Sequence, residues 1–553
     1  MKKVFLILLL LLFIPSLSAG KNLYEDQLNR GIRNSEPYSY LLINQSKIDR
    51  DNAKDILKEA LRYSPDLPAV YFEMAKASFT FKTGGAFEAF DYIIQGIAAY
   101  KRNFWWSFMM ILSLFTSLVL SFIVSLLIIT LIRLPRDIPL LSHDLKEEKT
   151  RIMLLLVFIF AVFGPLYFLG SLLIIISFYM RKRDRILVYL YLLFLLASPW
   201  VYKAFSAGLS VPSSGELRAV VQVNEAKGNR YALSVLQGSN DPGELFSYAL
   251  ALKREGRYSE AIGIYNRLLT VNPDPRAYNN LANCYVAIKD FEKAEELYKK
   301  SIKIQPLASS LYNLSQIYRE TLDFDKGDEY FLAAQQLDAG AVSNFRSIFG
   351  RNPNRFVIDE ELPYPAIREY AFKKIKNAPS GLSIIPPILI PLIVIVMIIL
   401  FYILDRRLKN RAYRCNRCGK IMCNKCEKHI LWGHMCLQCY RSLVKLEELD
   451  ARERIARILA VYEYRKKKKD MIKLLSFILP GSGQIYAGYP LYGLLFLWPF
   501  LFLLFIPLAN LVFRVEMAGF SHLWLNICAV FLMFMVYLIS NIITRRRLAK
   551  GWL

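Results

Sequence analysis

A chain of 553 residues is too long for one hydrophobic core, so we expect several modules. Its composition is 54% hydrophobic and 14% aromatic, above the usual range for a soluble domain, which argues against a wholly soluble protein. The formal net charge of +25 would suggest nucleic acid as the partner of a soluble protein, but lysines and arginines flanking membrane spans explain it more simply, so we expect no nucleic-acid partner.

The first 20 residues have the pattern of a signal peptide. Lys2 and Lys3 precede an apolar run, Val4–Ile14, and small residues between Ser16 and Gly20 suit a cleavage site. An uncleaved anchor helix would leave the next segment on the same side of the membrane. We therefore predict residues 1–20 as a signal peptide and residues 21–101 as exported.

Residues 21–101 contain a short helical repeat. A 33-residue step relates three pairs of positions: Ala53 and Ala86, Leu57 and Phe90, Ala60 and Ile93. This predicts one and a half to two repeats, which run into the first apolar segment through two tryptophans that suit a membrane interface.

Residues 102–206 are predicted to be a membrane segment. Three apolar runs occur there: Phe104–Ile132, Ile152–Met180 and Ile186–Tyr202. Each of the two intervening loops is rich in Lys and Arg, which favours the cytoplasmic side for both. Both loops lie on one side if the middle run is a re-entrant hairpin broken at Gly164 and Pro165, and we predict that arrangement.

A second repeat array follows at residues 216–340. The 33-residue step relates small residues at Ala249, Ala282 and Ser315, then at Ala261, Ala294 and Gly327. It relates aromatic residues at Tyr265, Tyr298 and Phe331, and Pro273 and Pro306 close the second helices. This pattern resembles the tetratricopeptide repeat, and residues 21–101 resemble it more weakly. The resemblance implies a superhelix whose concave face binds an unknown protein partner; the alternative is that the helices only support the membrane part.

Residues 341–383 are predicted to be a proline-rich connector before a transmembrane helix at 384–404. The stretch "RNPNRFVIDEELPYPAI" at 351–367 is acidic in its middle and should be extended. It either caps the array or occupies its groove. If the chain leaves the cytoplasm through 186–202 and returns through 384–404, the array is exported and the following cysteines are cytoplasmic. The exported segments hold one cysteine, Cys284, expected in the core.

Residues 415–440 hold a cluster of paired metal ligands. The pairs are Cys415 and Cys418, Cys423 and Cys426, His429 and His434, Cys436 and Cys439. Two-residue gaps let both sulfurs of a pair reach one tetrahedral Zn²⁺, so the spacing favours zinc over an iron–sulfur cluster. No acid or base accompanies them, so the zinc is expected to be structural.

The cysteine pattern resembles the second part of a FYVE-type or related treble-clef finger. The resemblance implies that Cys415, Cys418, Cys436 and Cys439 share one zinc. It assigns Cys423 and Cys426 to another zinc, but the first cysteine pair of such fingers is absent here. His429 and His434 would replace it, so one zinc is expected and a second is possible. The basic, histidine-rich stretch that FYVE fingers use for lipid headgroups is missing.

Residues 441–470 are predicted to form a basic helix. Residues 405–470 hold 19 Lys or Arg against eight Asp or Glu, which favours anionic lipid at the cytoplasmic face over DNA.

Residues 471–544 form a C-terminal membrane segment, broken at Pro480, Gly481, Gly483 and Gly488. With Tyr486 and Gly493, it resembles small two-span membrane domains. Two apolar runs occur there, Leu474–Leu511 and Leu523–Ile543. The resemblance implies two spans within the first run, which would leave the terminal arginines outside. Positive charge favours instead a short interfacial or re-entrant helix at 471–479, then one span, before the last run.

The predicted fold class is mainly α: tetratricopeptide solenoid helices, a multi-span helical membrane domain and a small zinc finger. No nucleotide-binding or nucleophile motif is present, His143 and His522 lack an evident partner, and the spans lack central charges, so we expect no enzyme. The prediction is a scaffold or assembly protein of the bacterial inner membrane, with periplasmic repeats and a cytoplasmic finger. The alternative is a subunit of a transport or secretion complex whose spans line a conduit.

Overall fold

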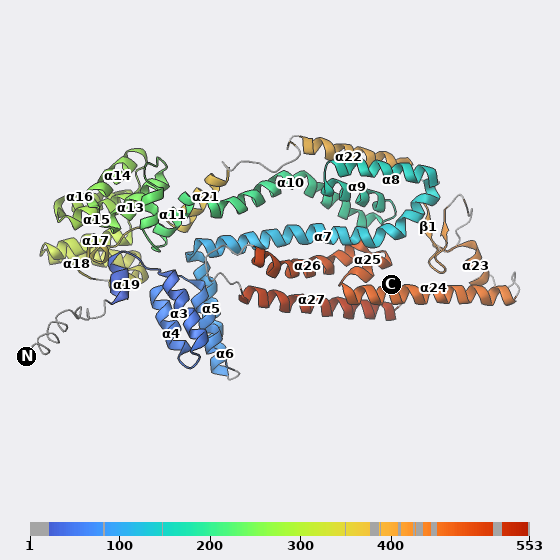
Figure 1. The fold of residues 1–553 in the computed structure, drawn as a ribbon, viewed down its shortest axis with the longest axis horizontal. Helices are drawn as coiled ribbons and strands as arrows, with labels where there is room; N and C mark the ends of the chain where they lie inside the picture. The colour runs from blue at the N-terminus through green and yellow to red at the C-terminus, as the bar shows by residue number, and fades with distance from the viewer. Residues whose placement is uncertain are drawn as a thin grey trace, which may run out of the picture. The chain divides into compact units, whose positions relative to one another are not determined.

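The protein is described by a computed structural model that divides into two compact units (Figure 1). The first unit comprises residues 1–108, 208–378 and 515–521, and the second comprises the rest. The residues that the structure describes are 22–80, 83–145, 147–348, 350–376, 386, 389–407, 411–423, 426, 435–443, 451–512 and 523–550. The predicted signal peptide lies outside them.

The first unit begins with a small helical module. Its elements are α2 (Leu23–Asn29), α3 (Glu36–Ile48), α4 (Ala53–Tyr63), α5 (Pro68–Ser78), α6 (Thr83–Ala99) and η1 (Tyr100–Arg102). Consecutive helices pair, and their apolar faces bury Leu57, Ala60 and Met74. Of the positions in the predicted 33-residue step, Phe90 is 60% exposed, so the repeat pattern is less regular here than in the second array.

The second array is a succession of helix pairs, in which each inner helix is followed by an outer one. The short helices η3 (Val211–Ser213), α11 (Gly215–Asn224) and α12 (Arg230–Val235) precede it. The pairs are α13 (Pro242–Arg254) with α14 (Tyr258–Val271), α15 (Pro275–Ala287) with α16 (Phe291–Ile304), and α17 (Ala308–Glu320) with α18 (Phe324–Leu337). The residues expected at packing positions, Ala249, Ala261, Tyr265, Ala282, Ala294 and Tyr298, are all fully buried, whereas Pro273 and Pro306 are exposed just after α14 and α16.

Side-chain caps and left-handed turns set the length of each helix in the array. Asp290 and Asp323 begin α16 and α18 by accepting a hydrogen bond from the backbone N–H three residues later. Between the two helices of each pair, Gly256, Lys289 and Leu322 have positive φ values of 80°, 63° and 64°. A turn with positive φ therefore recurs at the same 33-residue step. Glycine adopts this conformation freely, whereas lysine and leucine are strained in it.

The predicted connector is largely helical. It contains α19 (Ala339–Ile348), α20 (Pro353–Phe356) and α21 (Tyr364–Lys376), and residues 357–363 between α20 and α21 are not helical. The prediction of an extended stretch over 351–367 is therefore too long at both ends. Proline suits the first turn of a helix, and Pro353 and Pro365 both occupy such positions.

The second unit is built of long apolar helices. They are α7 (Phe104–Leu145), α8 (Glu147–Val162), α9 (Pro165–Ser177), η2 (Lys182–Arg185), α10 (Ile186–Ser210) and α22 (Leu389–Arg407). The helices α8 and α9 meet at Gly164, which has φ of +120° and precedes Pro165 at the start of α9. They pack on each other, with the rings of Phe158 and Phe168 5.4 Å apart, and each is shorter than the roughly 20 residues that cross a bilayer.

The C-terminal part of this unit is a helix, a glycine-rich bend and two further helices. These are α24 (Ala451–Ile478), α25 (Ser482–Ala487), α26 (Pro490–Val512) and α27 (Leu523–Ala549). The basic helix continues past residue 470 to Ile478 without a break, so the structure has no separate short helix at 471–479. Two long apolar helices, α26 and α27, follow the bend. The bend requires glycine, because a Cβ on Gly481 would lie 2.2 Å from the carbonyl oxygen of Gly493, and Gly481 and Gly488 have positive φ.

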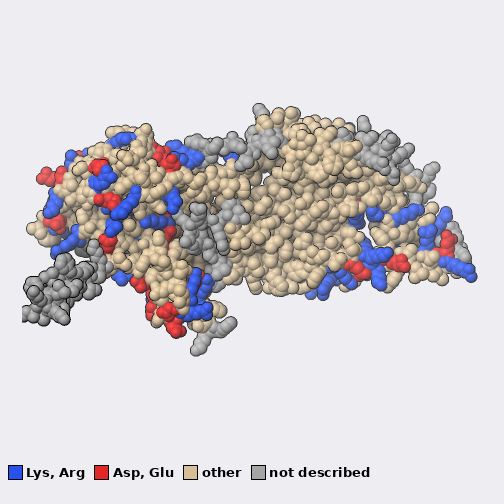
Figure 2. All heavy atoms as spheres, in the orientation of Figure 1, with Lys and Arg blue, Asp and Glu red and all other residues tan. Residues whose placement is uncertain are grey.

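Five helices among the described residues are long and apolar enough to cross a membrane. They are Phe104–Leu145, Lys182–Ser213, Leu389–Arg406, Pro490–Leu511 and Leu525–Ala549. Figure 2 shows that the face of these helices in view is almost free of charged side chains, while lysines and arginines gather over α24.

Candidate peptide groove and metal centre

The inner helices of the array present buried asparagines to one groove. Asn279, Asn280 and Asn283 lie on α15, Asn313 on α17 and Asn224 at the end of α11. All five are at most 4% exposed. A buried amide needs hydrogen-bond partners, so such a row must face another polar chain.

The partner is the chain's own extended segment, residues 357–362. The carbonyl oxygen of Ile358 accepts hydrogen bonds from the side-chain amides of Asn279, Asn283 and Asn313 at 3.1, 2.9 and 2.8 Å. The backbone N–H of Ile358 donates to Asn313 Oδ1 at 2.7 Å. The groove therefore binds both the backbone carbonyl and the backbone N–H of Ile358.

The same contact recurs at every second residue of the segment. Asn280 donates to the carbonyl of Glu360 and accepts from its N–H, both at 2.8 Å, and the N–H of Leu362 donates to Asn224 Oδ1 at 2.7 Å. Because successive side chains of an extended chain alternate in direction, Asp359 and Glu361 lie on the same side of the segment, where Asp359 Oδ1 also accepts a hydrogen bond from Asn283 at 2.8 Å.

Asp359 and Glu361 meet two cations at the end of α13. Lys253 Nζ lies 2.8 Å from Asp359 Oδ1, and Arg254 lies 3.4 Å from Asp359 and 2.9 Å from Glu361. Burial disfavours the charged form of Asp359, but Lys253 and Arg254 outweigh it and hold its pKa below the usual range. Burial raises the pKa of Glu360, and the Ser309 hydroxyl and Arg276 only partly offset it.

The segment therefore occupies the groove, one of the two alternatives that the sequence left open. The asparagines that hold it were missed, because an isolated asparagine in a helix is ordinarily a surface residue. The available signal was the 33-residue step from Asn280 to Asn313, which places asparagine at equivalent positions of two inner helices.

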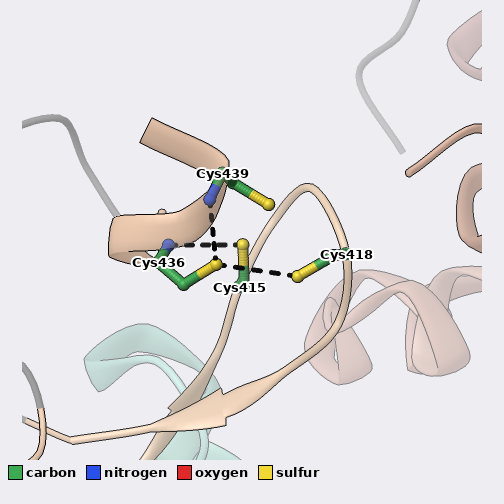
Figure 3. A group of neighbouring side chains, drawn as sticks. All are labelled: Cys415, Cys418, Cys436 and Cys439. Atoms are coloured by element: carbon green, nitrogen blue, oxygen red, sulfur yellow. Dashed lines mark hydrogen bonds between the residues drawn. The ribbon is translucent and has the colours of Figure 1, made fainter. Parts of the chain in front are cut away.

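The metal centre is a short hairpin followed by a helix. Strand β1 (Tyr413–Arg414) pairs antiparallel with β2 (Ile421–Met422), and the turn between them, with Gly419 at φ +77°, carries Cys415 and Cys418. Helix α23 (Leu437–Leu443) brings Cys436 and Cys439 to the same point, where the four sulfurs converge (Figure 3).

The four sulfurs have the spacing of a tetrahedral zinc site. Their Sγ atoms all lie within 4.8 Å of one another, and those of Cys418 and Cys436 are 3.7 Å apart. Zinc–sulfur bonds of about 2.3 Å at tetrahedral angles place sulfurs about 3.8 Å apart, so the donor set fits Zn²⁺. Four thiolates would fill the coordination sphere of the zinc ion, so the role of the ion would be structural.

Backbone amides favour thiolate at this site. Burial opposes ionisation of Cys415, but N–H groups of Arg417 and Cys436, each 3.4 Å from its sulfur, help to lower its pKa to about 7. Burial raises the pKa of Cys436 to about 11 and that of Cys439 further. One thiol of the group is thus set to ionise near neutral pH, which a metal ligand requires.

Cys423 and Cys426 do not join these four. Their Sγ atoms lie 3.5 Å from each other, and Cys426 lies 3.4 Å from Nε2 of His143 on α7. His429 and His434, the predicted companions of this pair, lie outside the described residues. The sequence left His143 without a partner because it precedes Cys423 by 280 residues.

A basic cavity of about 650 Å³ lies beside the metal centre in the second unit. Its lining includes Arg133, Arg136, Arg181, Arg414, Arg417, Arg465, Lys468 and Lys469. Asp137 is the one acidic residue among the described residues that line it, and it is paired with Arg133 at 2.8 Å. Burial and the nearby arginines lower the pKa of Lys468, so the cavity has an unbalanced positive charge.

Comparison with known proteins identifies the array. Three family models of the tetratricopeptide repeat match residues 242–284, 275–306 and 308–340. Residues 242–340 are therefore tetratricopeptide repeats, which confirms the resemblance drawn for the second array, and repeats of this family are protein–protein interaction modules.

Curated relatives include the mitochondrial import receptor subunit TOM70 of two Saccharomyces cerevisiae strains, YJM789 and S288c. Each is 42% identical over 57 residues, which is 9% of this chain and 9% of the relative. The chain thus spans about a tenth of the length of these relatives. They contradict the predicted bacterial inner membrane with periplasmic repeats. A basic, apolar leader and flanking positive charge indicate insertion and orientation, but they do not specify which membrane.

Proposed function

We propose that the protein is an integral membrane scaffold that holds a partner protein in the groove of its tetratricopeptide array and makes a second contact through its zinc finger. The observation that carries this is the asparagine row around residues 357–362. Those asparagines bind backbone groups, which every protein offers, and Lys253 and Arg254 add a preference for acidic side chains. The partner is then an extended acidic segment similar to Ile-Asp-Glu-Glu-Leu.

The internal segment must leave before such a partner binds. Its backbone groups occupy the asparagine amides in the structure, so internal and external segments compete for the same atoms. An internal segment on a short tether acts at an effective concentration of millimolar order, so a free peptide of equal intrinsic affinity binds poorly until the tether is disabled.

The test is binding of a fluorescent peptide of residues 355–364 to the full-length protein in detergent. The variant Ile358→Pro removes the N–H that donates to Asn313 and releases the internal segment, whereas Ile358→Val keeps the backbone and serves as the control. We expect the proline variant to bind the peptide at least tenfold more tightly than wild type or the valine variant. Equal binding by all three proteins would refute the groove as a partner site.

The packing of α7 favours a scaffold over a conduit. Four serines at four-residue spacing, from Ser113 to Ser125, lie on one face of this helix and are at most 1% exposed. Ser117 and Ser125 donate hydrogen bonds to the carbonyl four residues earlier, and Ser121 accepts one from Trp498 on α26. Three of the four hydroxyls thus have partners, whereas Ser113 Oγ is buried without one among the described residues. Small residues at such positions allow close packing of helices, which supports a packed bundle.

We assign the finger to the treble-clef type, with a structural zinc at its four-cysteine group. A hairpin turn and the first turn of a helix each supply two ligands, which supports the FYVE-like resemblance, and four sulfurs leave no open position for a substrate. We propose no enzymatic activity for this chain.

Anionic lipid is the proposed second ligand, bound by the basic cavity. Its cations have too few carboxylates to balance them, so a phosphate group would relieve their mutual repulsion. The test is native mass spectrometry of protein from nanodiscs that contain phosphatidylserine and phosphatidylcholine. Wild type and a Lys467→Ala control, altered on the exposed side of α24, should retain phosphatidylserine, and Arg136→Ala with Lys468→Ala should lose it. Equal retention by all three would refute the site.

A further inference from the structure

A second group of potential metal ligands joins the finger to the end of a membrane helix. One ligand atom each from His143, Cys423 and Cys426 lies within 4.8 Å of the others. The Nε2 atom of His143 is 3.4 Å from the Cys426 sulfur, which is itself 3.5 Å from that of Cys423. Two sulfurs and one imidazole nitrogen at these separations fit three corners of a tetrahedral zinc site.

The imidazole is oriented for this role. Nδ1 of His143 is buried and has no hydrogen-bond partner among the described residues, and Asp144 Oδ1 lies 3.8 Å from it. A carboxylate on that side favours the tautomer with its proton on Nδ1, which leaves the lone pair of Nε2 facing the sulfurs. Asp144 is itself fixed by the N–H of Ala412 and the hydroxyl of Tyr179, both at 2.9 Å.

The hairpin is held against α7 independently of any metal. Arg414 donates to the carbonyl oxygen of Arg136 at 2.9 Å, and Leu140 of α7 packs against Ala412 and Cys423. These contacts lie within the second unit. The meeting of His143 with the two cysteines therefore follows from an extensive interface and does not depend on one side chain.

We propose that His143, Cys423 and Cys426 bind a second Zn²⁺, which couples the finger to the membrane helix α7. This differs from a site made only within the finger, in which His429 and His434 would both be ligands. Here His143 supplies the third protein ligand, and the fourth position is left to a ligand outside these three residues. Binding releases the thiol protons of the two cysteines.

The test measures metal content and cysteine protection in the full-length protein in detergent. Zinc per chain is measured by inductively coupled plasma mass spectrometry. Each cysteine is then scored by alkylation with N-ethylmaleimide and peptide mass spectrometry. The variants are His143→Ala, His143→Cys, which restores a ligand, and His429→Ala and His434→Ala singly.

Wild type and His143→Cys should bind two zinc ions and protect all six finger cysteines. His143→Ala should bind one, with Cys423 and Cys426 alkylated at least tenfold faster while the four-cysteine site stays protected. That protection is the internal control for folding. Two ions and unchanged protection in His143→Ala, with loss in both single finger-histidine variants, would overturn the proposal. A single ion in wild type would also overturn it.

Discussion

Replacing Asp359 by alanine would test the ion pair that holds the internal segment in the groove. Lys253 is fully buried, and among the described residues Asp359 is the carboxylate within salt-bridge distance of its ammonium group. The substitution leaves that cation buried without a counter-charge. Breaking a buried pair in this way costs about 3–5 kcal/mol, so we expect the array to lose about that much stability.

Cys284 provides a local measure of this loss. Its side chain is fully buried on α15, and burial raises the pKa of its thiol to about 12, so it reacts only when the array opens. Since about 1.4 kcal/mol corresponds to a factor of ten, alkylation of Cys284 in Asp359→Ala should be roughly two to four orders of magnitude faster. The site is followed by peptide mass spectrometry in the full-length protein.

Two further variants separate the ion pair from a general effect of mutation. Asp325→Ala removes an exposed carboxylate of α18 and should leave the Cys284 rate unchanged. Lys253→Met combined with Asp359→Leu replaces both charges by apolar groups and should recover most of the lost stability. A rate in Asp359→Ala within threefold of wild type would refute the reasoning.

The pKa of Asp359 also fixes the pH range of this contribution. Because the folded pKa is lowered, the stabilisation is fully present above the unfolded carboxyl pKa of about 4 and is lost as the pH falls through the folded value. Hydrogen exchange in α15, corrected for the intrinsic rate, should therefore show no loss of this contribution between pH 8 and 5. A loss within that range would contradict the assignment.

Three other outcomes are expected. Leu322→Gly should stabilise the array by about 0.5–1 kcal/mol, because this exposed residue has a positive φ, and Gly256→Ala should do the reverse; Cys284 alkylation measures both. Gly481→Ala should lower the melting temperature of the full chain more than Gly164→Ala does. Both glycines have positive φ, but only at the first does a Cβ meet a carbonyl oxygen at 2.2 Å, whereas nothing lies within 4 Å at the second. Chelation should expose Cys415 to alkylation at pH 7.5, and unchanged protection would exclude a metal there.

The features that the sequence predicted well are periodic or local. The repeated array was predictable because small and aromatic residues return every 33 positions. The four-cysteine group was predictable because each pair of ligands is separated by two residues. Both patterns depend only on short segments of chain.

The features that could not be predicted from the sequence depend on contacts between distant segments of the chain. Nothing near Cys423 in the sequence indicates His143, whereas His429 and His434 lie close by, so the local pair was preferred. Asn283 was overlooked for a related reason, since its role depends on a segment 75 residues later. The sequence also predicts a separate short helix at 471–479, whereas α24 runs unbroken from the basic segment to Ile478, because the residues that break the helix begin only at Pro480.

The position of the groove segment suggests how partner binding would reach the membrane. Residues 357–362 lead along the chain through α21 to α22, which is apolar enough to cross a membrane, and Lys373 of α21 pairs at 2.7 Å with Asp241, which caps α13. A partner that displaces the segment must overcome an internal competitor at about millimolar effective concentration, so micromolar binding to wild type requires roughly a thousandfold, or about 4 kcal/mol, from contacts beyond the groove. We therefore expect a physiological partner to contact the convex helices or the finger as well, and a short acidic peptide alone to remain a weak ligand of the intact protein.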